Sequence, residues 1–595
     1  MTEDPAASPR PNVLWISTHD INPHIGAYAD VYPGAEYART PHLDRLAAEG
    51  ARFDSAFAAA PICAPSRSAI MTGCFPTAIG TMHMRTKAVP PPEVKLFTEY
   101  FRQAGYYVTN NWFTDFQVPV PLSAFDDCSE TAHWRNRPDP NQPFFATFHG
   151  MATHESQIYL DDDAFAARTS HVGEADRHDP ARAPLPPYYP DTEVFRRSWA
   201  RYNDLITEMD HWVGQLLAEL EADGLAADTI VVFWSDHGLG MPRAKRWAND
   251  SGLHEPLIIR WPGKIPANTV VPGLVHLMDL APSMLAACGL PIPEHMHARP
   301  FLDPDGGIRN DANEYLFAGR DRMGELEDMS RSIRDRRFRY IRHFHPDRSP
   351  MQHCDYPDHL DTWAEMRRLA QAEAVQLAQG RLRSALTPLQ RSLVAAWKPA
   401  EELYDITADP HETINLAPDP GYHDVLQRFR TELERWQDRY GDLGRIPEDE
   451  LIEQWRPGGI WPTTEPPQLS ADASGSLIIT TATEGASLIW TSDERDGEPA
   501  TPQPGNAATF GTPADDPRRW HLLCAVTPPP ADRPYWLRAT RVGYLPSPAV
   551  RIPEASLTPN LCGRNSSFPS GRSSALTSIR SLPQPDNAGP APMSP

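Results

Sequence analysis

The chain has 595 residues, and at about 150 residues per domain we expect three or four domains. Its formal net charge is −23, because 78 acidic side chains outnumber 55 basic ones. This acidity excludes nonspecific binding to nucleic acid and to anionic membranes, because both need a basic surface. It does not exclude a local cationic pocket, since the net charge describes no single cleft.

The N-terminus and the cysteines predict a cytoplasmic protein without a membrane anchor. The first residues, MTEDPAASPRPNV, contain no apolar run, so we expect no signal peptide. No run of about 18 apolar residues, the length of a transmembrane helix, occurs in the sequence. The seven cysteines are few, odd in number and not spaced as metal ligands. We therefore expect reduced thiols rather than a disulfide framework or a zinc ribbon.

Short apolar runs alternate with helical patterns in the first half of the chain. The runs are rich in Val, Ile and aromatic residues, as is typical of buried parallel strands, and cover 12–17, 143–148, 229–234 and 256–261. Apolar residues recur every three or four positions across 192–224, and 41–50 starts with Pro and ends with Gly, so both predict helices. We expect an α/β core over 10–310, with a mostly parallel sheet flanked by helices and a ligand site at the carboxyl ends of its strands.

A smaller α+β subdomain is expected to follow the core. The sequence predicts strands at 338–343 and 403–405 and long helical segments at 362–397 and 422–440. We expect these elements to form a subdomain over 311–450 that packs on the main sheet.

The last part of the chain predicts a β-module and a tail. A linker rich in Pro, Gly and Thr at 456–470 precedes β-type runs at 476–492 and 535–552, which predict a small β-sandwich module over 470–553. Such a module either contacts substrate or packs on the core, and we expect packing. Residues 554–595 have little to bury, so we expect disorder there and no catalytic role for Cys562.

Polar side chains follow two of the predicted strands. Asp20 lies after the strand at 12–17, and Asp236 and His237 lie after the strand at 229–234. These groups could converge on one cation above the sheet, and carboxylates favour a hard ion such as Ca²⁺ or Mg²⁺. The alternative is that they are only caps and turn residues, and spacing alone does not decide between the two.

Cys63 is the second candidate for chemistry. Pro65 fits the first turn of a helix, so Cys63 lies at or just before a helix N-terminus, with Arg67 one turn further on. Helix amides and an arginine together make an anion site, and they would lower the pKa of a thiol. The alternative is a buried structural cysteine beside a surface arginine.

The residues around Cys63 resemble the signature of a known family. CAPSRSAIMTG is similar to the sulfatase signature, in which Cys, Pro, Ser and Arg are followed after four residues by Thr-Gly. Further similar segments occur in the family's order: NVLWISTHD, TPHLDRLAAEGARFDSAF, VVFWSDHG, KRWANDSGLHEPLIIRWPG and ELYDITADPHETINLA. Residues 11–445 thus resemble formylglycine-dependent sulfatases of the alkaline-phosphatase superfamily. The phrases IGTMHMRT and AGYYVTNN look most like bacterial heparan N-sulfatase-like proteins.

The resemblance implies a covalent mechanism. Cys63 would be converted to formylglycine by a formylglycine-generating enzyme. One hydroxyl of the aldehyde hydrate would attack sulfur, and the other would then expel sulfate. Arg67 would hold the hydrate, Lys245 would bind sulfate and help to protonate the leaving group, and His154 would bind sulfate or act as an acid.

The resemblance also implies a metal site that includes residue 63 itself. Asp20, Asp236 and His237 match metal ligands of the family. His19 stands where most sulfatases carry a second Asp, and we expect it to face the site. Calcium is the first candidate, with Mg²⁺ or another ion as alternatives, although a histidine ligand weakens the case for calcium.

A second departure from the family concerns substrate binding. Phe113 stands where the family supplies a lysine, and Asp115 stands where a histidine often follows. One cationic contact to sulfate is therefore missing unless Lys87, Arg85 or His83 replaces it. Removal of such a group typically lowers the rate by orders of magnitude.

Three residues are expected to bind substrate: His83, His149 and Asp115. For each of the two histidines the alternative is a polar residue without a role in binding.

The sequence supports one function before its alternatives. We expect a sulfatase that hydrolyses a sulfate ester or a sulfamate on a sulfated small molecule, and the resemblance implies a carbohydrate. The alternatives are a formylglycine-dependent phosphonate or phosphate ester hydrolase, and a weakly active or degenerate sulfatase-fold binding protein. A cysteine phosphatase is excluded, because its arginine lies six residues after the cysteine whereas Arg67 lies four after Cys63.

Overall fold

The computed structural model describes residues 10–380, 385–471, 477–492, 516–530 and 533–553. The tail at 554–595, with Cys562, lies outside these residues, so its expected disorder stays a prediction. The six cysteines in the described part are all free, and no described helix is both long and apolar enough to cross a membrane.

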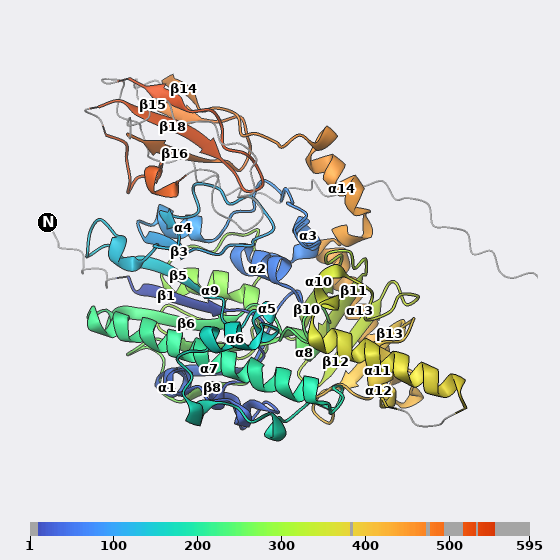
Figure 1. The fold of residues 1–595 in the computed structure, drawn as a ribbon. Coiled ribbons are helices and arrows are strands. Elements are labelled where there is room, and N and C mark those ends of the chain that lie inside the picture. The colour runs from blue at the N-terminus through green and yellow to red at the C-terminus, as the bar shows by residue number, and fades with distance from the viewer. Residues whose placement is uncertain (1–9, 381–384, 472–476, 493–515, 531–532, 554–595) are drawn as a thin grey trace, which may run out of the picture.

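A nine-stranded sheet forms the centre of the molecule (Figure 1). Its order is β4-β3-β5-β1-β6-β7-β2-β8, with β9 beside β2. The strands are β1 (Asn12–Thr18), β2 (Ala51–Phe57), β3 (Tyr107–Asn111), β4 (Asp127–Cys128), β5 (Phe144–Gly150), β6 (Thr229–Ser235), β7 (His254–Arg260), β8 (Thr269–Val271) and β9 (Val275–His276). Only β7 runs antiparallel to its neighbours β6 and β2, so the predicted mostly parallel sheet is confirmed. The four apolar runs all form strands, but the expectation that 256–261 is parallel was wrong.

Helices cover both faces of this sheet. Alternate residues of β1 point to opposite sides, and Leu14 packs under α1 (Pro41–Glu49) and α7 (Glu193–Ala222), whose ends lie within two residues of the predicted ones. Trp15 packs on the other face, under α2 (Cys63–Thr72), α4 (Thr98–Gln103) and α9 (Leu280–Ala287). A parallel sheet is stable only when both faces are covered in this way. Short helices in the connections are α3 (Pro76–Ile79), α5 (Glu155–Ile158), α6 (Asp162–Arg168) and α8 (Asp250–Leu253).

A four-stranded antiparallel sheet follows in the chain. It consists of β10 (Leu316–Arg320), β11 (Ser330–Arg334), β12 (Phe338–His343) and β13 (Glu401–Asp405), in that order. One face is covered by α13 (His423–Tyr440), whose Phe429 and Trp436 pack with Tyr340 and Leu403 of the sheet. The cluster also contains Phe75, next to the signature helix, so this sheet packs on the core as expected.

The predicted long helix at 362–397 is interrupted in the structure. It forms α11 (Asp361–Ala378) and α12 (Pro388–Leu393), and α10 (Asp355–Asp358) precedes them. Gly380 has a left-handed φ of 70°, which ends α11. Pro388 occupies the first position of α12, where its missing N–H costs no helical hydrogen bond.

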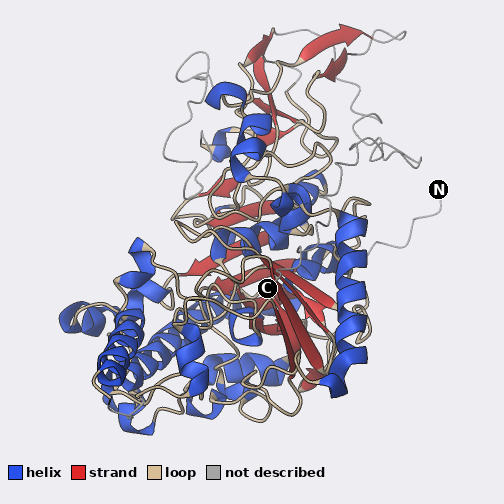
Figure 2. Ribbon diagram, turned by 90° about the vertical axis from the view of Figure 1, so that its right-hand side faces the viewer, coloured by secondary structure: helices blue, strands red, loops and turns tan. Residues whose placement is uncertain are grey.

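The C-terminal residues form two antiparallel sheets beyond α14 (Glu448–Trp455) (Figure 1). One pairs β14 (Gln468–Ala471) with β15 (Leu477–Thr480), and the other contains β16 (Ser487–Thr491), β17 (His521–Leu522), β18 (Tyr535–Thr540) and β19 (Val550–Ile552). Figure 2 shows this module at one end of the molecule, beyond the central sheet.

The module packs on the core, as expected. Lys95 Nζ of the core donates to Ser487 Oγ at 2.7 Å, and Arg102 Nη2 donates to the carbonyl oxygen of Trp520 at 2.9 Å. Trp520 and Ile489 also pack with Leu122 of the core.

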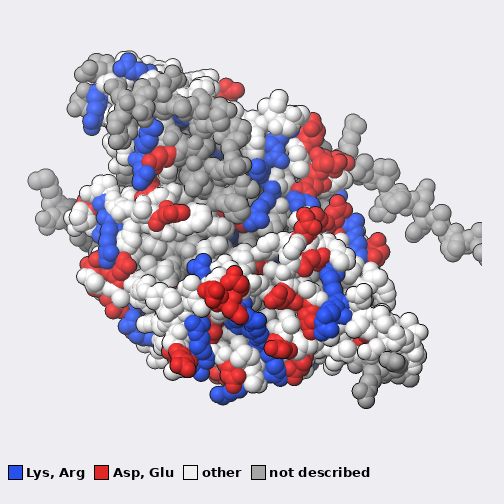
Figure 3. Space-filling model, in the orientation of Figure 1, with Lys and Arg blue, Asp and Glu red and all other residues white. Residues whose placement is uncertain are grey.

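On the face in Figure 3, described basic and acidic side chains are interspersed rather than gathered into one basic patch.

A buried ion network around Arg331 of β11 gives a stability prediction. Arg331 is fully buried and binds Asp321 and Asp442, with Nη2–Oδ1 distances of 2.9 and 2.7 Å. We expect Arg331→Met to lower the free energy of unfolding by about 3–5 kcal/mol, because it leaves two carboxylates buried without their partner. Denaturant unfolding measures the change. Arg435→Ala, an exposed arginine paired with Glu432, is the control and should change it by less than about 0.5 kcal/mol.

Candidate active site

The register of the central sheet brings three segments to one point. Thr18, the last residue of β1, lies opposite Ser235 at the end of β6 and Gly150 at the end of β5. Because these strands are parallel, the residues that follow them emerge at the same edge. β2 has the same direction, since both β2 and β6 are antiparallel to β7, and it leads into the loop before Cys63. The predicted site residues therefore meet above the carboxyl ends of the strands.

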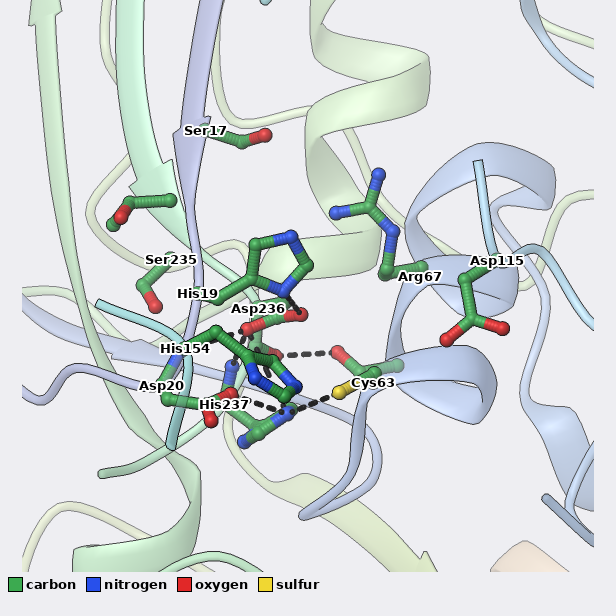
Figure 4. A network of polar contacts seen from close by, with 12 residues as sticks. Ser17, His19, Asp20, Cys63, Arg67, Asp115, His154, Ser235, Asp236 and His237 are labelled. Carbon is green, nitrogen blue, oxygen red and sulfur yellow. Dashed lines mark hydrogen bonds and ion pairs between the residues drawn. The ribbon is translucent and has the colours of Figure 1, made fainter. Parts of the chain in front are cut away.

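Two buried acid groups and their cationic partners form the centre of the site (Figure 4). Asp236 Oδ2 lies 3.0 Å from His19 Nδ1, and Asp20 Oδ2 accepts a hydrogen bond from Lys245 Nζ at 2.8 Å. His237 Nε2 lies 3.3 Å from Asp20 Oδ1. All five side chains are buried. Asp20, Asp236 and His237 thus lie together as the sequence predicts, His19 faces them, and Lys245 joins them.

Cys63 faces this cluster from the first residue of α2. Its Sγ lies 3.1 Å from His237 Nε2, and its side chain points toward the cluster (Figure 4). Burial raises the pKa of the Cys63 thiol, although the Lys245 charge works to lower it. The expectation of a lowered thiol pKa was therefore wrong, because the loss of hydration outweighs the nearby positive charge. A thiol of this kind is a poor thiolate nucleophile.

The donor set fits a divalent cation. One ligand atom each from His19, Asp20, Cys63 and Asp236 lies within 4.8 Å of all the others. Within the described chain, four buried polar atoms of this set make no hydrogen bond: His19 Nδ1 and Nε2, Asp20 Oδ1 and Asp236 Oδ2. Three of these four atoms belong instead to the ion pairs His19–Asp236 and His237–Asp20. Burial works to lower the pKa of His19, but the Asp236 charge raises it to about 9.

Arg67 carries an unused donor into the same site. Its side chain is 1% exposed, and its Nε donates to the carbonyl oxygen of Thr114 at 2.8 Å. The Nη1 atom makes no hydrogen bond within the described residues. Such a buried, unsatisfied guanidinium donor is costly unless an anion accepts from it. The predicted anion site of Cys63 and Arg67 therefore has a structural counterpart.

Two site residues escaped the sequence analysis. Glu155 Oε1 lies 2.9 Å from Lys245 Nζ, and both Glu155 oxygens accept from Arg246, at 2.7 and 2.9 Å. The Glu155 backbone N–H also donates to Asp20 Oδ2. Burial works to raise the pKa of Glu155, but the Arg246 and Lys245 charges hold it below its usual range. The two missed residues are Glu155 and Arg246. The sequence marks them only by adjacency, since Glu155 follows His154 and Arg246 follows Lys245.

The two histidines at the end of β5 and in the loop after it contact different parts of the site. The ring of His154 lies 5.9 Å from that of His19, and burial and the Lys245 charge lower its pKa to about 4. His149 contacts Arg67 Nη2 at 3.2 Å and Asn110 Oδ1 at 3.0 Å, so it supports the arginine from behind. Burial and the Arg67 charge hold the pKa of His149 well below its usual range.

Asp115 and His83, also predicted to bind substrate, have different surroundings. Asp115 lies beside Arg67 and Cys63 (Figure 4), and its Oδ2 lies 3.2 Å from Arg85 Nη2. His83 Nδ1 accepts from the Arg322 backbone and lies 3.9 Å from Glu448, so its ring faces the C-terminal segment.

Phe113 occupies the place of the expected lysine as an apolar wall of the site. Its ring is 5% exposed, lies edge-on to His19 at 4.9 Å and is 5.0 Å from the Arg67 guanidinium carbon. The ring therefore shields His19 and Arg67 from water without adding a positive charge.

Comparison with known proteins decides the family. The model of the sulfatase family matches residues 11–138 and 125–290, and one described as N-sulphoglucosamine sulphohydrolase, C-terminal, matches 240–392. An ulvan-active sulfatase of Formosa agariphila is 35% identical over 587 residues, which cover 92% of this chain and 92% of that protein. The chain belongs to the sulfatase family. It is a sulfuric ester hydrolase, and the predicted family and enzyme class are confirmed.

Two more distant comparisons agree with this sulfatase family membership. N-acetylgalactosamine-6-sulfatase of Rattus norvegicus is 29% identical over 343 residues, covering 48% of this chain and 64% of that protein. A solved structure in complex with its substrate, D-glucosamine-2-N,6-O-disulfate, matches with a TM-score of 0.51 at 18% identity, covering 74% of this chain and 100% of that one. At this identity the likeness concerns the fold alone, and it confirms the alkaline-phosphatase-like α/β class of the sulfatase.

Proposed function

We propose that this sulfatase removes sulfate from a sulfated carbohydrate, as an ester or a sulfamate, through formylglycine at position 63 and a bound divalent cation. One observation carries the proposal: ligand atoms of Cys63, His19, Asp20 and Asp236 lie buried within 4.8 Å of one another, and the buried Arg67 Nη1 makes no hydrogen bond within the described residues. The names of the relatives support a carbohydrate substrate, since one is ulvan-active and another acts on N-acetylgalactosamine 6-sulfate.

The proposed cation would be held by His19, Asp20, Asp236 and residue 63, with His237 beside them. A divalent cation at such a site polarises sulfate and hydrate oxygens. Two carboxylates favour calcium, whereas His19 also admits other ions. Lys245 and Arg246 anchor the set from outside, because both bind Glu155 and Lys245 also binds Asp20.

The remaining roles follow from charge and position. Burial works to lower the pKa of Lys245, but the Asp20 charge raises it well above its usual value, so the ammonium stays protonated. It can therefore contact sulfate as a cation and donate a hydrogen bond to the leaving oxygen or nitrogen, although a raised pKa does not favour full proton transfer. With a pKa of about 4, His154 is neutral near pH 7, so its imidazole can accept or donate a hydrogen bond but brings no charge. Arg67 Nη1 would bind the hydrate or a sulfate oxygen.

Two measurements test this function. Mass spectrometry of the peptide that spans Cys63, from a host with a formylglycine-generating enzyme, should show loss of the thiol and gain of the aldehyde. A panel of sulfated sugars, with phosphonate and phosphate esters as the comparison, should then show multiple turnover on a sulfated sugar. An unmodified Cys63 would contradict the mechanism, and turnover of phosphonate esters alone would contradict the substrate class.

Arg85 is proposed to supply the cationic contact that Phe113 does not. Its side chain is 37% exposed and is held by Asp115, and both residues have left-handed backbone, with φ of 58° and 48°. Such strained backbone is typical of functional sites, but Lys87 shares it with a φ of 57°, so the contact of Arg85 with Asp115 is what favours Arg85. Of the other cations, Lys87 Nζ lies over the ring of Trp461 at 5.9 Å.

We expect Arg85→Ala to lower kcat/KM for the sulfated substrate by about 10²-fold, because one charged sulfate contact is lost. Arg85→Lys should restore part of the activity, since it keeps the charge but not the paired donors to Asp115. Steady-state kinetics measure both. Lys87→Ala is the matched control and should leave kcat/KM nearly unchanged. An equal loss in the two alanine variants would show that Arg85 has no special role.

A further inference from the structure

A second cavity lies where the central sheet meets the antiparallel sheet of β10–β13. Its volume is about 260 Å³. Residues of the core and of the segments after β11 and β13 line it together, among them Tyr32, Tyr188, Arg243, Arg336, His411 and Glu412. The ligand set and Lys245 of the Cys63 cluster are not among its lining residues, so the cavity is a separate site.

Arg243 and Glu412 form a strained and incompletely satisfied wall of this cavity. They are 3% and 1% exposed, and both have left-handed backbone, with φ of 62° and 51°. Arg243 Nη2 donates to the Glu412 carbonyl oxygen at 2.6 Å. Arg243 Nη1 makes no hydrogen bond within the described residues and lies 3.9 Å from Glu412 Oε2. A buried donor without an acceptor lowers stability, and so does a strained backbone. The fold therefore tolerates two costs in holding this guanidinium at the cavity.

The charges around the cavity favour an anionic ligand. Each of its three lining carboxylates already has an arginine within ion-pair distance, in the pairs Asp54–Arg52 at 2.8 Å, Asp250–Arg334 at 2.9 Å and Glu412–Arg339 at 3.3 Å. Arg336 donates to the carbonyl oxygen of Asn310 and forms no ion pair within the described chain. Arg336 is therefore the cation that can pair with a ligand, and Arg243, paired with Glu412 at 3.9 Å, offers its Nη1 donor, which makes no hydrogen bond within the described residues.

Aromatic rings make up another part of the wall. The Tyr32 ring lies 5.2 Å from that of His254, and Arg243 stacks over the Tyr188 ring at 4.7 Å. Burial keeps His254 neutral near pH 7, with its pKa lowered to about 4. Rings of this kind pack against the apolar face of a sugar, while arginine and histidine bind its polar groups. The volume is near the lower end of ligand pockets and suits one small ring.

We propose that this cavity binds an acidic monosaccharide unit, with its carboxylate on Arg243 and Arg336 and its ring against Tyr32 and Tyr188. The site goes beyond the proposed hydrolysis, because it shares no ligand residue with the Cys63 cluster. The two sites nevertheless share one loop, since Arg243 of the cavity precedes Lys245 of the Cys63 cluster by two residues. A test must therefore separate binding in the cavity from binding at the cluster.

Isothermal titration calorimetry of the full chain with sodium D-glucuronate tests the proposal. We expect saturable binding to the wild type and a rise in Kd of about tenfold in Arg336→Ala and in Arg243→Met, because each loses one charge-assisted contact. Arg336 is exposed, so its variant keeps the test decisive if Arg243→Met does not fold. Arg435→Ala is the matched control and should bind as the wild type does.

Three further titrations distinguish the sources of binding. Cys63→Ala should retain the affinity for glucuronate, which assigns it to the cavity rather than to the catalytic cluster. D-Glucose should bind at least about tenfold more weakly, because it lacks the carboxylate. No saturable binding to the wild type, undiminished affinity in Arg336→Ala, or equal affinity for inorganic sulfate with the same dependence on arginine would each overturn the proposal.

Discussion

Cys63→Ala is expected to lower kcat for the sulfated substrate by about 10⁵-fold or more, the loss that follows when a covalent nucleophile is removed. The remaining cluster would still bind sulfate through Arg67 and the cation. Because the substitution removes only a small buried side chain, the fold should be kept. Steady-state hydrolysis and thermal unfolding measure the two effects on the same preparation.

Two variants make this result specific for residue 63. Cys63→Ser keeps a hydroxyl nucleophile but not the aldehyde hydrate, so we expect a sulfated protein after one turnover and no further product. Intact-mass measurement detects the added sulfate. Cys288→Ala, another buried and free cysteine, is the matched control and should keep wild-type kcat. Sustained turnover by Cys63→Ser would contradict the role of formylglycine.

Asp236→Asn is expected to lower kcat by about 10³-fold and to abolish tight binding of the divalent cation. The variant replaces a charged ligand by a neutral amide, and a Lewis-acid contact contributes several kcal/mol to the transition state at about 1.36 kcal/mol for each factor of ten. Chelation of the wild type should have an effect of similar size that added calcium reverses. Calorimetric titration of the cation into the protein gives a readout that does not depend on activity.

A buried aspartate outside the site controls for the loss of a charge. Asp328 is buried and pairs with Arg320 at 3.2 Å and Lys398 at 3.1 Å. Asp328→Asn should therefore lower stability, as Asp236→Asn does, while leaving cation affinity and kcat unchanged. Wild-type cation affinity in Asp236→Asn would refute the proposed ligand set.

Local patterns were sufficient for most of the core. The apolar runs that became β1, β5, β6 and β7 are strands because their side chains are buried on both faces, and such strands are apolar throughout. The amphipathic stripe of α7 and its Thr192 cap have the same local origin. The split of 362–397 was missed, because the apolar pattern continues across Gly380 and Pro388 while the backbone does not.

Part of the site could also be predicted, but not its connections. His19, Asp20, Asp236 and His237 were found because they follow strands whose carboxyl ends meet at one edge. Glu155 and Arg246 were missed, because their pairing joins segments about 90 residues apart, as the separation of 91 in the Arg246–Glu155 hydrogen bonds shows. The sequence offered three residues in place of the lysine expected at position 113. The choice of Arg85 among them needed the contacts that the fold shows.

The sequence by itself determined the family, the α/β class and the candidate residues for the chemistry, since strand burial, helix caps and a compact signature are local properties of the chain. Only the tertiary structure decided what those residues experience. Burial raises the pKa of Cys63 where the local pattern predicts a lowered one, and it leaves Arg67 Nη1 and Arg243 Nη1 without acceptors. Desolvation and pairing depend on which distant segments pack together, and a net charge of −23 describes neither.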